Sequence, residues 1–255
     1  MSASNEINQA QQAWMDGVLT QVEQALSDWV APTAPERLDE AMRYAVLDGG
    51  KRLRPLLVFA AAQAVGAQKD CPATLRAACA VELIHAYSLV HDDMPCMDND
   101  VLRRGKPTVH VKFGQAQALL AGDALKALAF ELLTPTEDVV DASTQAKLCR
   151  LLAMSAGCHG MAGGQAIDLA NVGQHLHLDQ LKHMHKLKTG ALLQASVMMG
   201  AACMPNGQTL TKQTQLALQQ YGEALGVAFQ VVDDILDVTA DTATLGKTAG
   251  KDAQD

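Results

Sequence analysis

Aromatic residues are scarce in this sequence, where Phe, Trp and Tyr together make up 4% of 255 residues. Runs in which apolar and polar residues alternate, the pattern of a half-buried strand, are also hard to find. Ala, Leu, Gln, Met and Glu dominate instead, and these residues favour helices. The sequence therefore predicts an all-α protein.

Long apolar runs are missing too. No segment reaches about 18 consecutive apolar residues, the length that a membrane-spanning helix needs, and the polar N-terminus MSASNEINQAQQAW lacks the apolar core of a signal peptide. The formal net charge is −8 and the basic stretches are short, which argues against a surface for nucleic acid or anionic lipid. We expect a protein that binds no nucleic acid and is not an integral membrane protein.

Cysteine and histidine show no metal-type or disulfide-type spacing. The dispersed cysteines, none of them in a CxxC pair, are typical of reduced thiols and a cytoplasmic location; they are Cys71, Cys79, Cys96, Cys149, Cys158 and Cys203. The histidines of HLHLDQLKHMH also lack a recognised zinc pattern, so we interpret that stretch as a surface helix; they are His175, His177, His183 and His185.

Proline and glycine divide the chain into helical segments. The predicted segments are 31–50, 54–68, 71–93, 109–133, 144–160, 178–202 and 211–238. Two stretches have almost no polar face, AVELIHAYSLV (80–90) and EALGVAFQVV (223–232), and this predicts helices buried on all sides. No linker or composition shift divides the chain, so we expect one domain over 1–255, with more than four helices.

Two aspartate clusters lie in apolar surroundings: HDDMPCMDND at 91–100 and VVDDILDV at 231–238. In the second, Asp233 and Asp237 are four residues apart and share a helix face. In the first, six residues separate Asp92 from Asp98, too many for one face of a straight helix, but a break at Pro95 can bring them together.

Buried carboxylates repel one another unless a cation lies between them. Each cluster alone would favour a solvated helix end. Two such clusters are present, and both lie in apolar helices. We therefore favour aspartates that bind Mg²⁺, which prefers hard oxygen ligands. Aspartates that hold several Mg²⁺ ions form a net cationic site, which suits a diphosphate.

Basic residues accompany the aspartates. GGKRLRP (49–55) alone favours a helix-capping loop with solvated cations, because it lacks the spacing of a phosphate-binding P-loop. RRGKPT (103–108) follows the first aspartate cluster directly. Arginine binds phosphate oxygens with a two-pronged fork. One anionic group held by metal and a second held by Lys and Arg indicate two phosphorylated substrates.

These motifs resemble those of the polyprenyl synthetase family, the short-chain trans-prenyltransferases. DDMPCMD at 92–98 is similar to the family's first aspartate-rich motif, and DDILD at 233–237 to its second. Further segments follow in family order from about residue 25 to Asp255: GGKRLRP, IHAYSLVHDD, LRRGKPT, AGDAL, GGQAIDL, HKLKTGAL and DTATLGK. The resemblance implies a large orthogonal helix bundle of the isoprenoid synthase type with a central metal–diphosphate cavity.

The resemblance also implies residue roles. The Mg²⁺ ligands, for three ions per site with substrate bound, are Asp92, Asp98 and Asp233, supported by Asp93, Asp234 and Asp237. The residues implied to bind the allylic diphosphate are Arg103, Lys188, Lys247 and Lys251. Those implied to bind isopentenyl diphosphate are Gly50, Lys51, Arg54, His85 and Arg104. The residues implied to face the developing carbocation are Thr189 and Gln230.

The implied reaction is a Mg²⁺-dependent head-to-tail (1'-4) condensation of isopentenyl diphosphate with dimethylallyl or geranyl diphosphate, by a homodimer. Tyr87 and Ser88, five and four residues before Asp92, imply a closed product pocket and a fifteen-carbon product, farnesyl diphosphate. A geranylgeranyl diphosphate synthase is the first alternative. A terpene cyclase is less favoured, because its second motif usually mixes Asn or Asp, Ser or Thr, and Glu. A non-catalytic partner subunit is also less favoured, because it typically lacks one of the two aspartate motifs.

Two departures from the family pattern stand out. Val101 replaces a common aspartate outside the metal motif, and we expect little effect. Family members normally continue with further helices after GKD, whereas this sequence stops at Asp255. We therefore expect a domain that lacks the family's C-terminal helices and leaves the second motif less covered.

Overall fold

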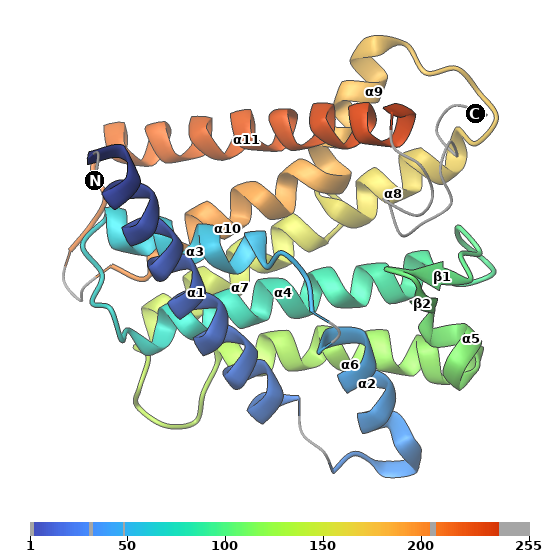
Figure 1. Cartoon of the computed structure of the whole chain (residues 1–255), viewed down its shortest axis with the longest axis horizontal. Helices are drawn as coiled ribbons and strands as arrows, with labels where there is room; N and C mark the ends of the chain where they lie inside the picture. Colours follow the sequence, from blue (N-terminus) through green and yellow to red (C-terminus); the bar gives the residue numbers. More distant parts are fainter. Residues whose placement is uncertain (1–2, 31–32, 48, 205–207, 240–255) are drawn as a thin grey trace.

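The structure, a computed structural model, describes residues 3–30, 33–47, 49–204 and 208–239. These residues form helices and one short hairpin (Figure 1), which confirms the all-α prediction. The helices are α1 (Ala3–Trp29), η1 (Pro35–Arg37), α2 (Leu38–Val46), α3 (Leu53–Ala64), α4 (Pro72–Asp92), α5 (Val109–Phe113), α6 (Gln115–Leu133), α7 (Ala142–Ala156), α8 (Met161–Ala170), α9 (Leu178–His185), η2 (Lys186–Gly190), α10 (Ala191–Ala202) and α11 (Lys212–Thr239). The antiparallel strands are β1 (Leu102–Arg103) and β2 (Lys106–Pro107).

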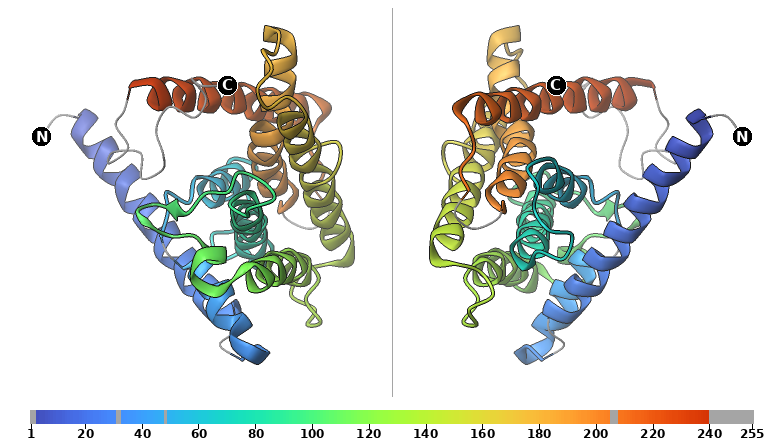
Figure 2. Two further views of the ribbon diagram at one scale, coloured as in Figure 1. Left: turned by 90° about the vertical axis from the view of Figure 1, so that its right-hand side faces the viewer. Right: turned by 90° about the vertical axis from the view of Figure 1, so that its left-hand side faces the viewer.

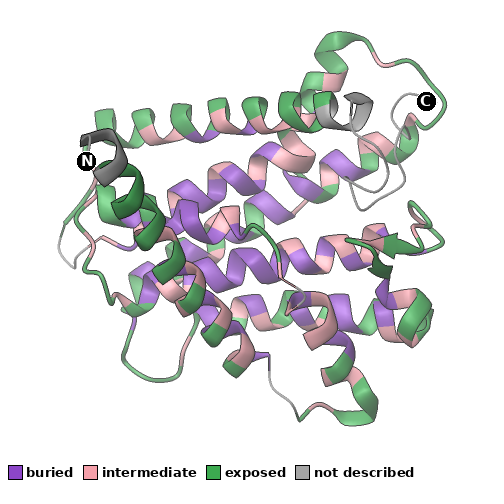
Figure 3. Ribbon diagram, in the orientation of Figure 1, coloured by how far each residue is buried: buried purple, intermediate pink, exposed green. Residues whose placement is uncertain are grey.

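Helix α4 is the centre of the bundle. Pro72 begins it in the first turn, where a missing N–H costs nothing, and α1, α2, α3, α6, α7 and α10 pack around it. Leu83 and Ile84 are fully buried, as the apolar stretch 80–90 predicts. Figure 2 shows α4 among the other helices, and much of α4 is coloured as buried in Figure 3. By length and composition α4 could cross a membrane, but 67% of its apolar window is buried within the bundle, as in the core helix of a globular domain.

Helix α11 is less buried than the sequence predicts. The expectation of a fully surrounded helix at 223–232 is wrong for the structure described, because Val227 and Val232 are 64% and 55% exposed. Much of α11 is coloured as exposed in Figure 3. The helix packs on α10 and η2 by one face only. That face carries Gly226, where an added Cβ would lie 2.9 Å from the Cα of Gly190.

Two predicted segments differ in detail from the regular helices that the sequence predicts. Segment 109–133 is divided into α5 and α6 at Gly114, whose φ of 89° lies in the left-handed region. Segment 178–202 is continuous, but its middle turn, η2, is a π-helix. Single π-turns of this kind are frequent at functional sites.

Helix α7 provides a stability prediction. The side chain of Asp141 accepts hydrogen bonds from the backbone N–H groups of Thr144 and Ser143 at 3.0 and 3.1 Å, and these partners lower its pKa from 3.8 to about 2. We expect Asp141→Ala to lower the free energy of unfolding by about 1 kcal/mol, measured by urea denaturation at pH 7.

The pH dependence has a defined sign. Because folding lowers the pKa of Asp141, its stabilisation is complete above the ordinary value of 3.8 and is lost as the pH falls toward 2. The exposed Asp138 makes a matched control, since Asp138→Ala removes the same charge without removing the cap. An equal loss of stability in both variants would contradict the capping role.

Candidate functional site

The first aspartate cluster lies where α4 ends. The backbone N–H of Asp98 donates to the carbonyl of Asp92 at 2.8 Å, and that of Asn99 donates to Met94 at 3.1 Å. These bonds close the loop that contains Pro95, so the break after the helix returns Asp98 to the side of Asp92, as the sequence predicts.

Asp92 is strongly perturbed. Burial raises its pKa from 3.8 to about 7; Lys188 opposes this shift and the charge of Asp98 adds to it. A partly buried carboxyl group whose charged form is disfavoured therefore lies beside a second carboxyl group. Hard, crowded oxygen atoms of this kind fit a divalent cation such as Mg²⁺.

Asp93 is already partnered. Both of its oxygens accept hydrogen bonds from Arg103 on β1, at 2.6 to 3.0 Å, and the Asp93 side chain is 4% exposed. Burial raises the pKa of Asp93 and Arg103 opposes that rise. The ion pair fixes the Arg103 guanidinium beside the end of α4. In this structure the Asp93 carboxylate therefore orients the side chain of Arg103.

Lys188 lies on the π-turn η2. Its Nζ is 2.5 Å from an oxygen of Asp168 on α8. Burial disfavours the charge of Lys188, but Asp168, Asp92 and Asp98 outweigh it and raise the lysine pKa. Asp168 lies within GGQAIDL, a segment to which the family resemblance assigns no residue role.

Gly164 allows this contact. A Cβ at that position would lie 2.2 Å from the backbone N of Lys188 and 2.5 Å from its Cα. Since Asp168 follows Gly164 by four residues, the two share one face of α8. The glycine thus brings α8 against η2 and places Asp168 within reach of Lys188.

A second, cation-rich cluster lies between the loop before α3 and the hairpin. Arg104 donates to the carbonyl of Gly49, and its Nη2 is 3.1 Å from where a Cβ on Gly50 (φ 143°) would lie. The buried Nε of Arg54 has no hydrogen-bond partner. Burial, followed by Arg54 and Arg104, holds the pKa of His85 well below its ordinary value, so the imidazole is neutral.

Among the described side chains, this cluster contains no anion that matches its positive charge. Burial lowers the pKa of Arg54, with only Glu82 opposing the shift, and burial together with Arg52 lowers that of Arg104. Lys51, in the same loop, is exposed. An arginine donor without a partner among neighbouring cations is a site that a phosphate group would satisfy.

The remaining predicted residues are placed as follows. Thr189 is half-buried on η2, and Gln230 is half-buried on α11, one turn after Gly226. Asp233 is exposed on α11, two turns after Gly226 and so on nearly the same side of the helix. The side chains of Asp234 and Asp237, and residues Lys247 and Lys251, lie outside the described part of the chain.

The two residues assigned to chain length, Tyr87 and Ser88, have side chains in different surroundings. Ser88 is buried, and its hydroxyl donates to the carbonyl of His85 at 2.8 Å within α4. The Tyr87 ring lies edge-on to His91, with centroids 5.6 Å apart, and 5.8 Å from Nζ of Lys126 on α6. Tyr87 therefore fills space between α4 and α6, about one turn before Asp92.

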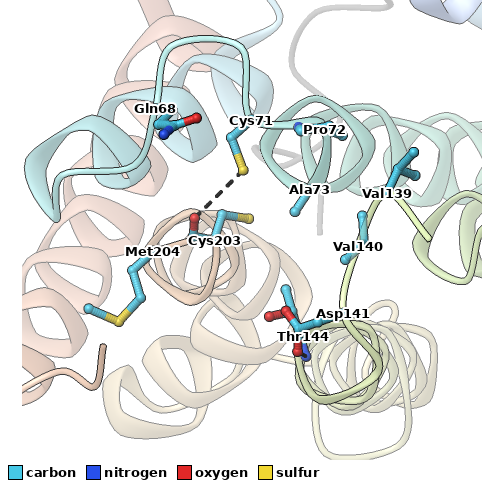
Figure 4. Close-up of a pocket in the computed structure, with 10 residues that line it drawn as sticks. All are labelled: Gln68, Cys71, Pro72, Ala73, Val139, Val140, Asp141, Thr144, Cys203 and Met204. Carbon is cyan, nitrogen blue, oxygen red and sulfur yellow. Dashed lines mark hydrogen bonds between the residues drawn. The ribbon is translucent and has the colours of Figure 1, made fainter. Parts of the chain in front are cut away.

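A complete metal centre does not stand out among the described side chains at this end of the bundle. No group of three or more His, Cys, Asp or Glu close enough to hold a metal is found among them, and the side chains of Asp234 and Asp237 lie outside that described set. A cavity of about 250 Å³ lies elsewhere, lined by Cys71, Asp141 and Cys203 among others (Figure 4). It borders the start of α4, about 30 Å from Asp92, and is not part of the candidate site.

All six cysteines are free, as predicted. Cys71 and Cys203 approach each other across this distant cavity, where the Cys71 thiol is 3.7 Å from the carbonyl of Cys203 (Figure 4). Burial raises the pKa of Cys203 to about 12, so its thiol is protonated at neutral pH. Cys71 and Cys203 therefore take no part in the candidate site.

Comparisons with known proteins agree with the motifs. The probable farnesyl diphosphate synthase of Sinorhizobium fredii is 50% identical over 244 residues, which cover 94% of this chain and 72% of the relative. The farnesyl diphosphate synthase of Escherichia coli is 48% identical over 245 residues, covering 94% of this chain and 80% of that protein.

Solved structures agree with the fold. An FPP/GFPP synthase from Zymomonas mobilis is 43% identical with a TM-score of 0.81, over 94% of this chain and 83% of that one. A Helicobacter pylori geranyltransferase, complexed with magnesium and isoprenyl diphosphate, is 34% identical with a TM-score of 0.84, over 95% and 80%. The bundle therefore has the all-α isoprenoid synthase fold. Since the polyprenyl synthetase family model matches residues 35–255, this chain belongs to the polyprenyl synthetase family.

Proposed function

We propose that this chain is a farnesyl diphosphate synthase. It joins isopentenyl diphosphate head-to-tail (1'-4) to dimethylallyl diphosphate and then to geranyl diphosphate. The observation that carries the proposal is the presence of two unlike anion sites near one end of α4. One is a carboxylate pair, Asp92 and Asp98, beside Lys188; the other is the arginine cluster around neutral His85.

The two sites suit two diphosphates bound in different ways. At the first, Asp92, Asp98 and Asp233 are the proposed ligands for Mg²⁺, three ions per site when substrate is bound. Bound Mg²⁺ neutralises charge that develops on the departing diphosphate. Lys188 and Arg103, oriented by Asp168 and Asp93, bind the same diphosphate directly. At the second, Arg54 and Arg104 hold isopentenyl diphosphate without metal.

The chain's residues then support ionisation and condensation. Fixed cations around the leaving group stabilise its charge in the transition state. Oxygen atoms of Thr189 and Gln230 stabilise the allylic carbocation that the isopentenyl double bond attacks, and the departing diphosphate takes the proton lost at the end. The apolar helices around the site exclude water that would quench the cation.

Product analysis tests the function. The chain is incubated with Mg²⁺, isopentenyl diphosphate and dimethylallyl diphosphate, and the dephosphorylated alcohols are identified by mass. We expect farnesol. Folded chain that makes no condensation product would overturn the proposal, and geranylgeraniol would replace it by the first alternative. Geranylgeranyl pyrophosphate synthases are also relatives, for example that of Catharanthus roseus at 44% identity.

Tyr87 is the proposed limit on chain length. Removing its ring in Tyr87→Ala opens space between α4 and α6 beside the aspartates, so we expect the main product to lengthen from fifteen to twenty carbons or more. Alcohols are compared by mass at equal turnover. Tyr87→Phe keeps the ring and should keep farnesol. An unchanged product in Tyr87→Ala would assign chain length to other residues.

Assembly and location complete the proposal. We propose a cytoplasmic homodimer, supported by exposed apolar side chains on α5 and α6: Val111, Leu119 and Leu120 are 49%, 46% and 52% exposed. Light scattering of the purified chain measures the mass, and a monomer at micromolar concentration would contradict the dimer.

A further inference from the structure

Arg52 is a buried cation that the predicted roles leave unexplained. It lies between Lys51 and Arg54 in the sequence, yet it is 4% exposed and its guanidinium contacts Glu82 inside the bundle. Its backbone adopts φ 46° and ψ 37°, the left-handed region that residues other than glycine rarely occupy. Strained backbone of this kind persists only where surrounding contacts hold it.

The guanidinium makes three such contacts. Nε donates to Glu23 on α1 at 2.7 Å, Nη1 donates to Glu82 on α4 at 2.8 Å, and Nη2 donates to the carbonyl of Val46 at the end of α2 at 2.6 Å. One side chain thus ties the loop at 49–54 to three helices. A planar fork is needed for this, because a lysine ammonium cannot meet three acceptors in these fixed directions.

Glu82 links this anchor to the proposed isopentenyl diphosphate site. It is buried on α4 three residues before His85, and so lies on the same side of that helix. Its charge also favours the charged form of Arg54, against the burial that lowers the Arg54 pKa. Glu82 therefore anchors the loop and supports the arginine that the loop carries.

From these contacts we infer that Arg52, with Glu82 and Glu23, is a positioning element that holds the loop at 49–54 in the conformation in which Lys51 and Arg54 receive the diphosphate of isopentenyl diphosphate. The inference rests on the proposed function. Arg52 itself touches no substrate. It determines affinity for one of the two substrates only, because the allylic site lies on α4, β1 and η2 and is held by other ion pairs.

The test compares the effect of each variant on the KM for isopentenyl diphosphate with its effect on the KM for geranyl diphosphate. We expect Arg52→Met to raise the KM for isopentenyl diphosphate on the order of 10- to 100-fold, with the KM for geranyl diphosphate within about threefold of the unaltered value. Arg52→Lys keeps the charge without the fork and should give an intermediate rise. Arg37→Met is the matched control, since Arg37 also has positive φ and pairs with a glutamate, but on the surface.

A second variant guards against misfolding. Arg52→Met leaves Glu82 buried without its partner, whereas the Arg52→Met/Glu82→Met double variant removes both buried charges. Only Glu23, whose side chain is 40% exposed, then lacks its partner. Folding is checked by circular dichroism. In the folded double variant we again expect the isopentenyl diphosphate KM to rise and the geranyl diphosphate KM to stay.

The outcomes separate this inference from the function on which it rests. If the folded variants keep the KM for isopentenyl diphosphate, or raise both constants equally, Arg52 is a structural residue only and the inference is wrong while the function stands. If the unaltered chain does not bind isopentenyl diphosphate in calorimetry, the proposed function fails first, and the inference fails with it.

Discussion

Asp92→Asn is expected to lower kcat/KM for condensation by about 10³-fold. The substitution keeps the size of the side chain and removes its charge. Asp92 is the carboxylate whose pKa is raised to about 7 by burial, and it lies beside Asp98 and Lys188. A neutral amide at this position weakens the hold on a divalent cation, so the Mg²⁺ concentration that gives half-maximal activity should also rise. Both quantities come from initial rates measured over a range of Mg²⁺.

The same variant should be more stable without ligand. Because folding raises the Asp92 pKa above its ordinary 3.8, the carboxylate is costly to the folded state at pH 8, and the cost grows as the pH rises from 3.8 to about 7. Removing the charge should therefore raise Tm in metal-free buffer, as expected where a site is built at the expense of stability. Lost activity with higher Tm excludes misfolding as the cause.

Asp70→Asn supplies the control. Asp70 is an exposed carboxylate just before α4, about 30 Å from Asp92. Asp70→Asn therefore makes the same change in charge as Asp92→Asn, but far from the site. Its activity, Mg²⁺ dependence and Tm should match those of the unaltered chain. Asp92→Asn that keeps more than a tenth of the activity would rule out Asp92 as a principal ligand.

The sequence predicts α4 well because all the relevant signals are local. Pro72 marks its start, the apolar stretch 80–90 marks its burial, and Pro95 marks the break beyond its end. The burial predicted for residues 223–232 of α11 is wrong for the structure described, although the apolar content of this stretch is similar. Apolar side chains favour a covered helix, but which element covers it depends on the rest of the chain.

The same division between local signals and contacts with the rest of the chain applies to the candidate site. The motifs predict Asp92, Asp98 and the arginines as site residues, since residue type and spacing carry that information. They do not identify the partners that orient these groups: Asp93 with Arg103, Lys188 with Asp168, and Arg52 with Glu82. Each pair joins residues on different parts of the fold, so it depends on how closely two segments approach each other. GGQAIDL contained the needed signal, because a glycine four residues before an aspartate suggests close packing next to a charge.

Gly164→Ala is expected to lower kcat/KM by about 10²-fold and to lower Tm. Alanine usually stabilises a helix interior relative to glycine by about 0.5–1 kcal/mol, so the expected sign is unusual. The added Cβ would lie 2.2 and 2.5 Å from backbone atoms of Lys188, which cannot move without η2. Separating α8 from η2 moves Lys188 away from Asp92 and Asp98. Steady-state kinetics and thermal unfolding measure the two effects.

Gly17→Ala is the matched control, because Gly17 lies inside α1 and a Cβ there meets no atom within 4 Å. It should raise Tm and leave kcat/KM unchanged, which shows the ordinary effect of the substitution. Lys188→Gln then separates packing from charge: it keeps the glycine contact, so Tm should fall less than in Gly164→Ala while activity falls at least as far. If Gly164→Ala instead behaves like Gly17→Ala, α8 and η2 do not pack as closely as described, and Lys188 owes its position to Asp168 alone.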